Sequence, residues 1–117
     1  MAAGDVVIAR DFLVGKSRGA KAGKPRFIYG TVQLDGSNPT PVTLTSYLSA
    51  VDAGGVSLEG SVAPGDDPVV VTSGISAAVL NVYAWKHTTG GAAGNPTLIA
   101  STDNARLVNW WAVGPSL

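Results

Sequence analysis

Short apolar runs alternate regularly with turn-forming residues along most of the chain, which leaves few folds open to it. The chain of 117 residues contains 15 glycines and 7 prolines, and sequences typical of turns recur about every ten residues. The runs between them are rich in β-branched and aromatic residues, as expected of strands. The spacing predicts an all-β fold: an antiparallel β-sandwich, jelly-roll or small barrel of about seven or eight strands. The runs that we expect to form strands are 26–35, 41–48, 56–59, 69–73, 78–86, 97–102 and 106–113.

The N-terminal segment has a different composition. Two small apolar clusters in residues 5–14 fit either a short strand or a docking segment, and residues 15–25 show no periodicity. We therefore expect a flexible basic N-terminal arm over residues 1–26 and a β-sandwich domain over 27–117. The basic residues of this arm, which we expect to contact a partner, are Arg10, Lys16, Arg18, Lys21, Lys24 and Arg26.

The charges of the two segments are opposite. Residues 1–26 carry six basic and two acidic residues, a net charge of +4, whereas residues 27–117 carry two basic and six acidic residues, a net charge of −4. Such an arm fits three roles: neutralising the phosphates of a nucleic acid, crossing a neighbouring protein subunit, or remaining a solvated tail. Because few aromatic residues stand near it for base stacking, nucleic acid is the less favoured partner.

The sequence offers little for catalysis or metal binding. It has no cysteine and a single histidine, His87, and no motif of the GxSxG type supports a nucleophile. The adjacent Asp66 and Asp67 lack the spacing of a calcium loop, and aspartates are frequent in turns. We expect no catalytic residue, no metal site, no cofactor and no enzymatic activity.

Four aromatic side chains are candidate interface residues. On the predicted strand 78–86, alternation places Leu80 and its apolar neighbours on one face and an aromatic pair on the other, and two adjacent tryptophans on 106–113 must point to opposite faces. These rings fit core packing, a protein interface, or a platform on which sugars stack. The four residues are Tyr83, Trp85, Trp110 and Trp111.

No segment approaches the roughly 18 uninterrupted apolar residues of a membrane span. The first ten residues, MAAGDVVIAR, have an apolar run too short for a signal peptide. We therefore expect synthesis in the cytoplasm and no membrane partner.

Several phrases of the body resemble small virion proteins of tailed bacteriophages, in particular capsid decoration (cement) proteins. They are GTVQLDGSNPTP at 30–41, LEGSVAPGDD at 58–67, YAWK at 83–86 and WWAVGP at 110–115. The resemblance covers about residues 27–117 and lies in general sequence character. It implies a β-sandwich or jelly-roll, often trimeric, bound on the outer capsid surface, with no catalytic residues to carry over.

The sequence thus favours a non-enzymatic virion structural protein that bridges coat subunits and stabilises the phage head. Its expected partners are the major capsid protein and further copies of itself, as a homotrimer. One alternative is a carbohydrate-binding or receptor-binding β-sandwich module of a head or tail fibre, which would use the tryptophans. Another is a nucleic-acid-binding protein that would use the basic arm.

Overall fold

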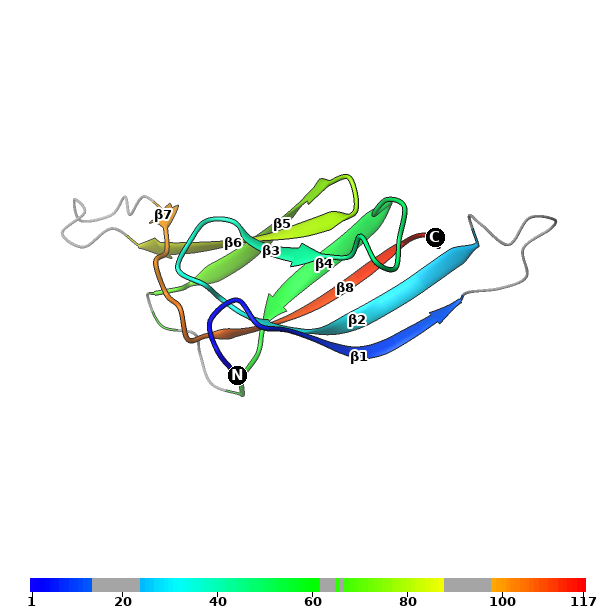
Figure 1. The fold of residues 1–117 in the computed structure, drawn as a ribbon. Coiled ribbons are helices and arrows are strands. Elements are labelled where there is room, and N and C mark those ends of the chain that lie inside the picture. The colour runs from blue at the N-terminus through cyan, green and yellow to red at the C-terminus, as the bar shows by residue number, and fades with distance from the viewer. Residues whose placement is uncertain (14–23, 62–64, 66, 88–97) are drawn as a thin grey trace.

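The protein is built from two antiparallel β-sheets that pack face to face as a β-sandwich (Figure 1). The computed structural model describes residues 1–13, 24–61, 65, 67–87 and 98–117, and no helix occurs among them. The all-β prediction is confirmed. The described residues form eight strands: β1 (Val6–Leu13), β2 (Pro25–Gln33), β3 (Thr40–Thr43), β4 (Ala53–Leu58), β5 (Val70–Ser76), β6 (Val79–His87), β7 (Leu98–Ala100) and β8 (Leu107–Pro115).

The first sheet has the strand order β1-β2-β8-β4, and the second has the order β3-β6-β5. The short strand β7 pairs with the end of β6, beyond the part of β6 that pairs with β3. Between them the Asn38 side chain accepts a hydrogen bond from the Ala84 amide at 2.8 Å. This contact fills the gap in the ladder along that edge of β6.

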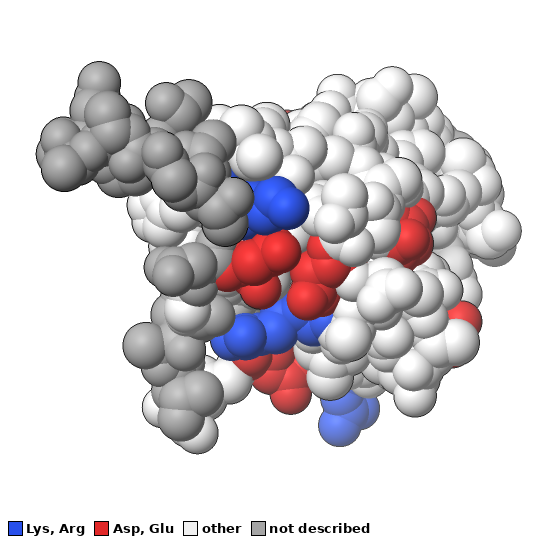
Figure 2. Space-filling view, turned by 90° about the vertical axis from the view of Figure 1, so that its left-hand side faces the viewer, with Lys and Arg blue, Asp and Glu red and all other residues white. Residues whose placement is uncertain are grey.

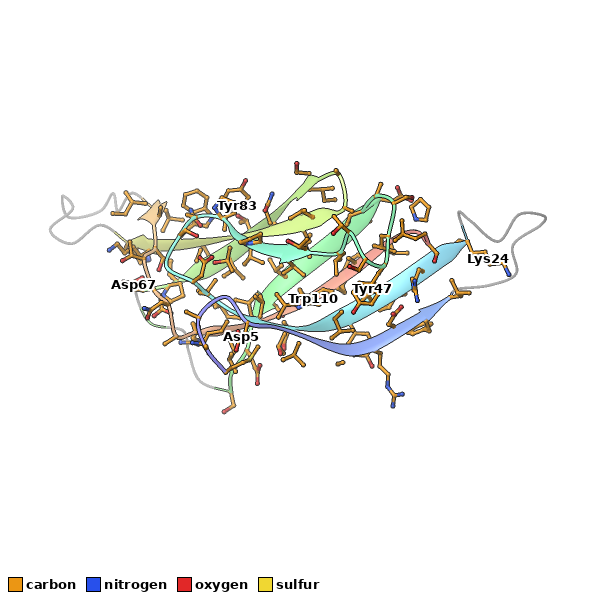
Figure 3. All side chains as sticks on the ribbon, viewed as in Figure 1. Asp5, Lys24, Tyr47, Asp67, Tyr83 and Trp110 are labelled. Atoms are coloured by element: carbon orange, nitrogen blue, oxygen red, sulfur yellow. The ribbon has the colours of Figure 1, made fainter. Side chains whose placement is uncertain are left out.

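The core lies between the two sheets and follows the period-2 alternation of the strands. Figure 3 labels Trp110 between the sheets, and its side chain is only 2% exposed. Leu80 and Val82 of the second sheet are fully buried opposite it, as their alternation on 78–86 predicted. The other members of the core are Ile28, Val32, Leu34, Val42, Leu44, Leu48, Val51, Ala84, Val108 and Ala112.

Two expectations about strand limits were wrong. The strand predicted over 41–48 ends at Thr43, because the chain then turns back on itself and the Tyr47 and Leu48 amides bond to the Leu44 carbonyl. The strand predicted over 56–59 begins earlier, at Ala53, and ends at Leu58 as β4. Glycine is needed inside this strand, since a Cβ at Gly54 would lie 2.8 Å from a methyl of Leu80 and one at Gly55 would lie 2.5 Å from the Trp111 ring nitrogen.

The extended N-terminal arm is not confirmed. Residues 6–13 form β1, which pairs with β2 from Val6 opposite Val32 to Leu13 opposite Arg26. The register shifts between Ile8 and Arg10, where a β-bulge bends the strand. Of the predicted arm cations, Lys16, Arg18 and Lys21 lie outside the described residues.

Candidate functional site

The outer face of the first sheet carries four aromatic rings, which we call the aromatic face. Phe12 comes from β1, Phe27 and Tyr29 from β2, and Trp111 from β8. The Phe27 ring is the centre: its centroid lies 5.6 Å from that of Phe12, 6.0 Å from that of Tyr29 and 6.0 Å from that of Trp111. The planes of Phe27 and Trp111 are within 14° of parallel. The four rings therefore form one continuous apolar surface.

The strand register brings these rings together. Phe12 is opposite Phe27 in the β1–β2 pair, and Tyr29 is opposite Trp111 in the β2–β8 pair. Side chains directly opposite each other in antiparallel strands share a face. On the far side of β8, Gly55 stands opposite Trp111 and leaves room for the indole. Close packing against a glycine thus helps to fix the direction of the Trp111 ring.

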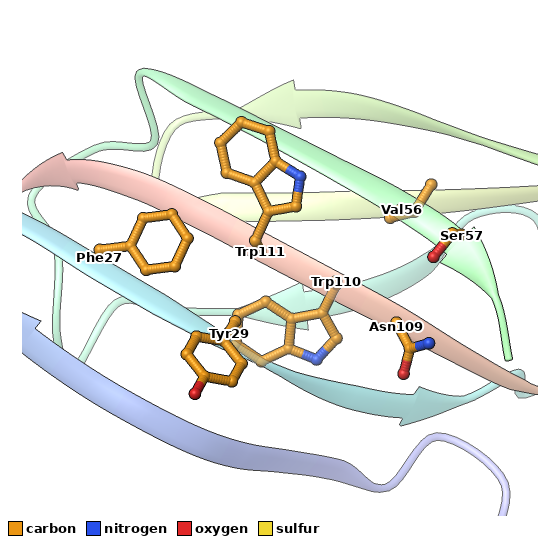
Figure 4. A pocket seen from close by; sticks show the side chains of 7 residues that line it. All are labelled: Phe27, Tyr29, Val56, Ser57, Asn109, Trp110 and Trp111. Atoms are coloured by element: carbon orange, nitrogen blue, oxygen red, sulfur yellow. The ribbon is translucent and has the colours of Figure 1, made fainter.

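The aromatic face contains an open hollow of about 350 Å³. Figure 4 shows Phe27, Tyr29 and Trp111 along it, with the polar pair Ser57 and Asn109 at one end. Val56 and Trp110 also contribute to its lining. The hollow is mostly apolar, with hydrogen-bonding groups at its margin, as in binding surfaces for proteins or small molecules.

The rings are unusually exposed for aromatic residues of so small a protein. Phe12 is 48% exposed, Tyr29 39% and Trp111 40%. Single exposed apolar residues are common, but contiguous apolar patches mark sites of interaction. The aromatic face is therefore the candidate functional site of this protein.

The predicted site aromatics fall in three different environments. Trp110 is a core residue, and its ring nitrogen is buried without a partner among the described residues. Trp111 belongs to the aromatic face, so the expectation that the two point to opposite sides is confirmed. Tyr83 and Trp85 lie on the outer face of the second sheet, as their alternation predicted.

Sequence reasoning missed Phe12, Phe27 and Tyr29 as members of the site. Alternation on the predicted strand 26–35 was sufficient to place Phe27 and Tyr29 on one face. Alternation alone does not give the strand register that places this strand beside β8.

Arg26 is engaged within the molecule rather than free on an arm. Its Nε donates to Asp11 Oδ1 at 2.6 Å, and its Nη1 donates to the Tyr47 carbonyl at 3.2 Å and to Ser116 Oγ at 3.3 Å. Its guanidinium carbon also lies 5.7 Å from the centre of the Tyr47 ring. Arg10 is exposed on β1, and Lys24 directly precedes β2. The predicted arm cations that the structure describes therefore lie in different structural settings; they are Arg10, Lys24 and Arg26.

Charged side chains of both signs lie beside one another at the end of the sandwich near the N-terminus (Figure 2). Lys86 Nζ lies 3.9 Å from Asp67 Oδ2, and the two side chains form an ion pair. Asp67 in turn accepts a hydrogen bond from the Ser101 hydroxyl at 2.6 Å. The described charges at this end are therefore mixed rather than of one sign.

The Asp35 carboxylate organises the turn between β2 and β3. Its Oδ1 accepts hydrogen bonds from the Ser37 amide and hydroxyl and from the hydroxyl of the buried Thr40. Partial burial raises the pKa of Asp35, but the hydrogen bonds from Ser37 and Thr40 outweigh it, so that the pKa is lowered from 3.8. The lowered pKa reflects a structural role in a turn.

Within the described ranges, no three His, Asp or Glu side chains are grouped so that they could hold a metal ion. The same residues include no helix that is long and apolar enough to cross a membrane. His87 is the last residue of β6.

The protein is therefore an all-β sandwich with an exposed aromatic surface on one of its two sheets. Comparison of the chain with known protein families, curated proteins and solved structures returns no match.

Proposed function

We propose that this protein is a non-enzymatic structural protein that docks through its aromatic face on a larger protein assembly. The observation that carries the proposal is the contiguity of Phe12, Phe27, Tyr29 and Trp111 on one face of the first sheet. Large aromatic residues dominate the energetics of protein interfaces because they bury much apolar area at little conformational cost. On the basis of the resemblance to capsid decoration proteins, we propose that this assembly is the outer surface of a phage capsid.

Docking through the face is favoured over docking through the edge of the sheet. β1 is the outermost strand of the first sheet and is exposed on both sides. However, it is bulged next to Arg10 and carries Arg10 and Asp11 at its centre. Bulges and charges on an edge strand oppose pairing with a further strand. A partner that covers the aromatic face requires no such pairing.

The contacts of Arg26 also favour a protein partner over a nucleic acid. Its guanidinium is held by Asp11, Tyr47 and Ser116, so binding a phosphate would require breaking contacts within the protein. Neutralising the charge of a nucleic acid requires several free cations on one surface. The aromatic face consists instead of uncharged rings, with the exposed Arg10 beside them opposite Tyr29.

The test is cosedimentation with shells of the major capsid protein prepared without this chain. We expect the wild-type protein to sediment with the shells and Trp111→Ala to bind at least about tenfold more weakly, as for loss of a central interface aromatic. Trp85→Ala, on the opposite face, is the matched control and should bind like the wild type. Failure of the wild-type protein to bind, or equal binding by Trp111→Ala, contradicts the proposal.

Self-association is a separate part of the proposal. The expected homotrimer is checked by light scattering of the free protein and of the protein released from shells. A free monomer that binds shells would support docking on the capsid and would contradict a preformed trimer.

A further inference from the structure

A second aromatic site lies on the opposite side of the protein. Tyr83 and Trp85 of β6 are two residues apart on a strand and therefore share the outer face of the second sheet. Their ring centroids are 6.2 Å apart, and their planes lie within 10° of parallel. Figure 3 shows Tyr83 on the side of the second sheet that faces away from the first. Both rings are half-buried, so each has covered and accessible surface.

Both rings are held in place by the neighbouring strand β5. The Trp85 ring nitrogen donates a hydrogen bond to the Thr72 hydroxyl at 2.8 Å. The Tyr83 ring lies against Gly74, where an added Cβ would be 3.1 Å from a ring carbon. Aromatic groups that are already oriented in the free protein lose less conformational entropy when a ligand binds.

The residues that flank the two rings across the strands are apolar or polar and carry no charge. In the register of β5, β6 and β7, Trp85 is flanked by Val70 and Ala100, and Tyr83 is opposite Thr72. Asn81 continues the same face along β6. The Lys86 side chain, one position along the strand, is paired with Asp67. A base-stacking surface for a nucleic acid would need cations for the phosphates, and the described residues directly across the strands from these rings include no lysine or arginine.

The hydrogen-bonding groups beside the rings suit a ligand that carries hydroxyls. The Thr72 oxygen accepts from Trp85 and leaves its own proton free to donate. The Asn81 amide offers both donors and an acceptor. Parallel aromatic rings flanked by such groups match a ring that has an apolar face and hydroxyl groups at its edge, which is the chemistry of a sugar.

We propose that Tyr83 and Trp85 form a stacking platform for neutral carbohydrate. This activity is distinct from docking through the aromatic face, because the two sites lie on the outer faces of different sheets. A chain attached to a particle by its first sheet would leave the second sheet open to the surroundings, and this consequence alone rests on the proposed function.

The test is binding of the full-length free protein to an array of neutral and acidic oligosaccharides, followed by titration calorimetry with the best neutral ligand. We expect binding to at least one neutral oligosaccharide and a loss of about tenfold or more in Trp85→Ala. Trp111→Ala is the matched control and should bind like the wild type. No capsid protein is present, so failure here is separable from failure of docking.

Three results would overturn the proposal: no binding to any neutral oligosaccharide, loss of binding in Trp111→Ala with retention in Trp85→Ala, or binding that requires an acidic sugar. Should Trp85→Ala fail to fold, Thr72→Val decides the question. That variant keeps both rings and the volume of the side chain but removes the hydrogen bond that orients the indole. It should bind several-fold more weakly, and unchanged binding by Thr72→Val would contradict the platform.

Discussion

The side chains of Arg26 and Asp11 meet across the β1–β2 pair with 2.6 Å between Nε and Oδ1. Neither residue is opposite the other in the register, since Asp11 faces Ile28 and Leu13 faces Arg26. The ion pair is therefore a diagonal contact that ties the outermost strand to its neighbour. The other contacts of Arg26 reach Tyr47 and Ser116, so one guanidinium joins four segments of the chain.

Arg26→Gln should loosen β1. The variant loses a charge-assisted hydrogen bond and the contacts to the Tyr47 carbonyl and Ser116, which at a partly exposed site should lower the free energy of unfolding by about 1–2 kcal/mol. Amide hydrogen exchange should rise most in β1. Arg10→Gln, on the same pair of strands, is the control and should change stability by less than about 0.5 kcal/mol. Equal effects of the two variants would show that the contacts of Arg26 are not important for stability.

The adjacent tryptophans of β8 should differ sharply in their effect on stability. Trp110→Ala opens a cavity in the core and should lower the free energy of unfolding by about 3–5 kcal/mol. Trp111→Ala removes an exposed ring and should cost about 1 kcal/mol or less. Urea unfolding monitored by circular dichroism measures both. Comparable losses would mean that the aromatic face contributes to folding as well as to binding.

Gly30→Ala should disrupt the junction of β1 and β2. A Cβ at this position would overlap the backbone carbonyl of Val7, which cannot move without shifting the strand. We expect a loss of about 1–3 kcal/mol, as for overpacking of a close contact. Thr31→Ala, the next residue on the opposite face, should cost about 1 kcal/mol or less. Thermal unfolding of the two variants provides the comparison.

Asp35 should make the free energy of unfolding depend on pH. Because its folded pKa lies below the ordinary value of 3.8, the carboxylate stabilises the fold above that pH and loses this contribution as the pH falls through the folded value. The difference in unfolding free energy between the wild type and Asp35→Asn should therefore shrink between about pH 5 and pH 2. Urea titrations at a series of pH values measure it. A difference that is constant with pH would contradict the assigned role of this carboxylate.

Local patterning was sufficient to predict much of the fold. Alternation along 78–86 correctly placed Leu80 inside and Tyr83 outside, because each residue of a strand faces opposite to the next. The turn at 44–48 was missed because its apolar residues continue the pattern of the preceding strand. The start of β4 was placed too late, at 56, because Gly54 and Gly55 precede it, and glycine in a turn and glycine at a close approach between neighbours look alike in sequence.

The aromatic face was harder to predict because it depends on long-range register. Phe12 and Trp111 are almost a hundred positions apart, and only the pairing of β1, β2 and β8 brings both against Phe27. The cluster of positive charge near the N-terminus suggested a separate arm. The apolar residues on either side of Arg10 were the stronger signal, since they pair with β2 and make residues 6–13 part of the sheet.

The distribution of the three tryptophans gives the protein built-in optical probes. Trp110 is enclosed in the core, Trp111 faces solvent beside Phe27, and Trp85 is hydrogen-bonded to Thr72 on the other sheet. Replacing any two of them by phenylalanine leaves a fluorophore that reports on one location only. Emission from Trp110 would follow unfolding. Emission from Trp111 would report a partner bound on the first sheet, and emission from Trp85 would report a ligand bound on the second sheet. A set of three such variants, each measured separately, can therefore distinguish events on the two sides of the molecule.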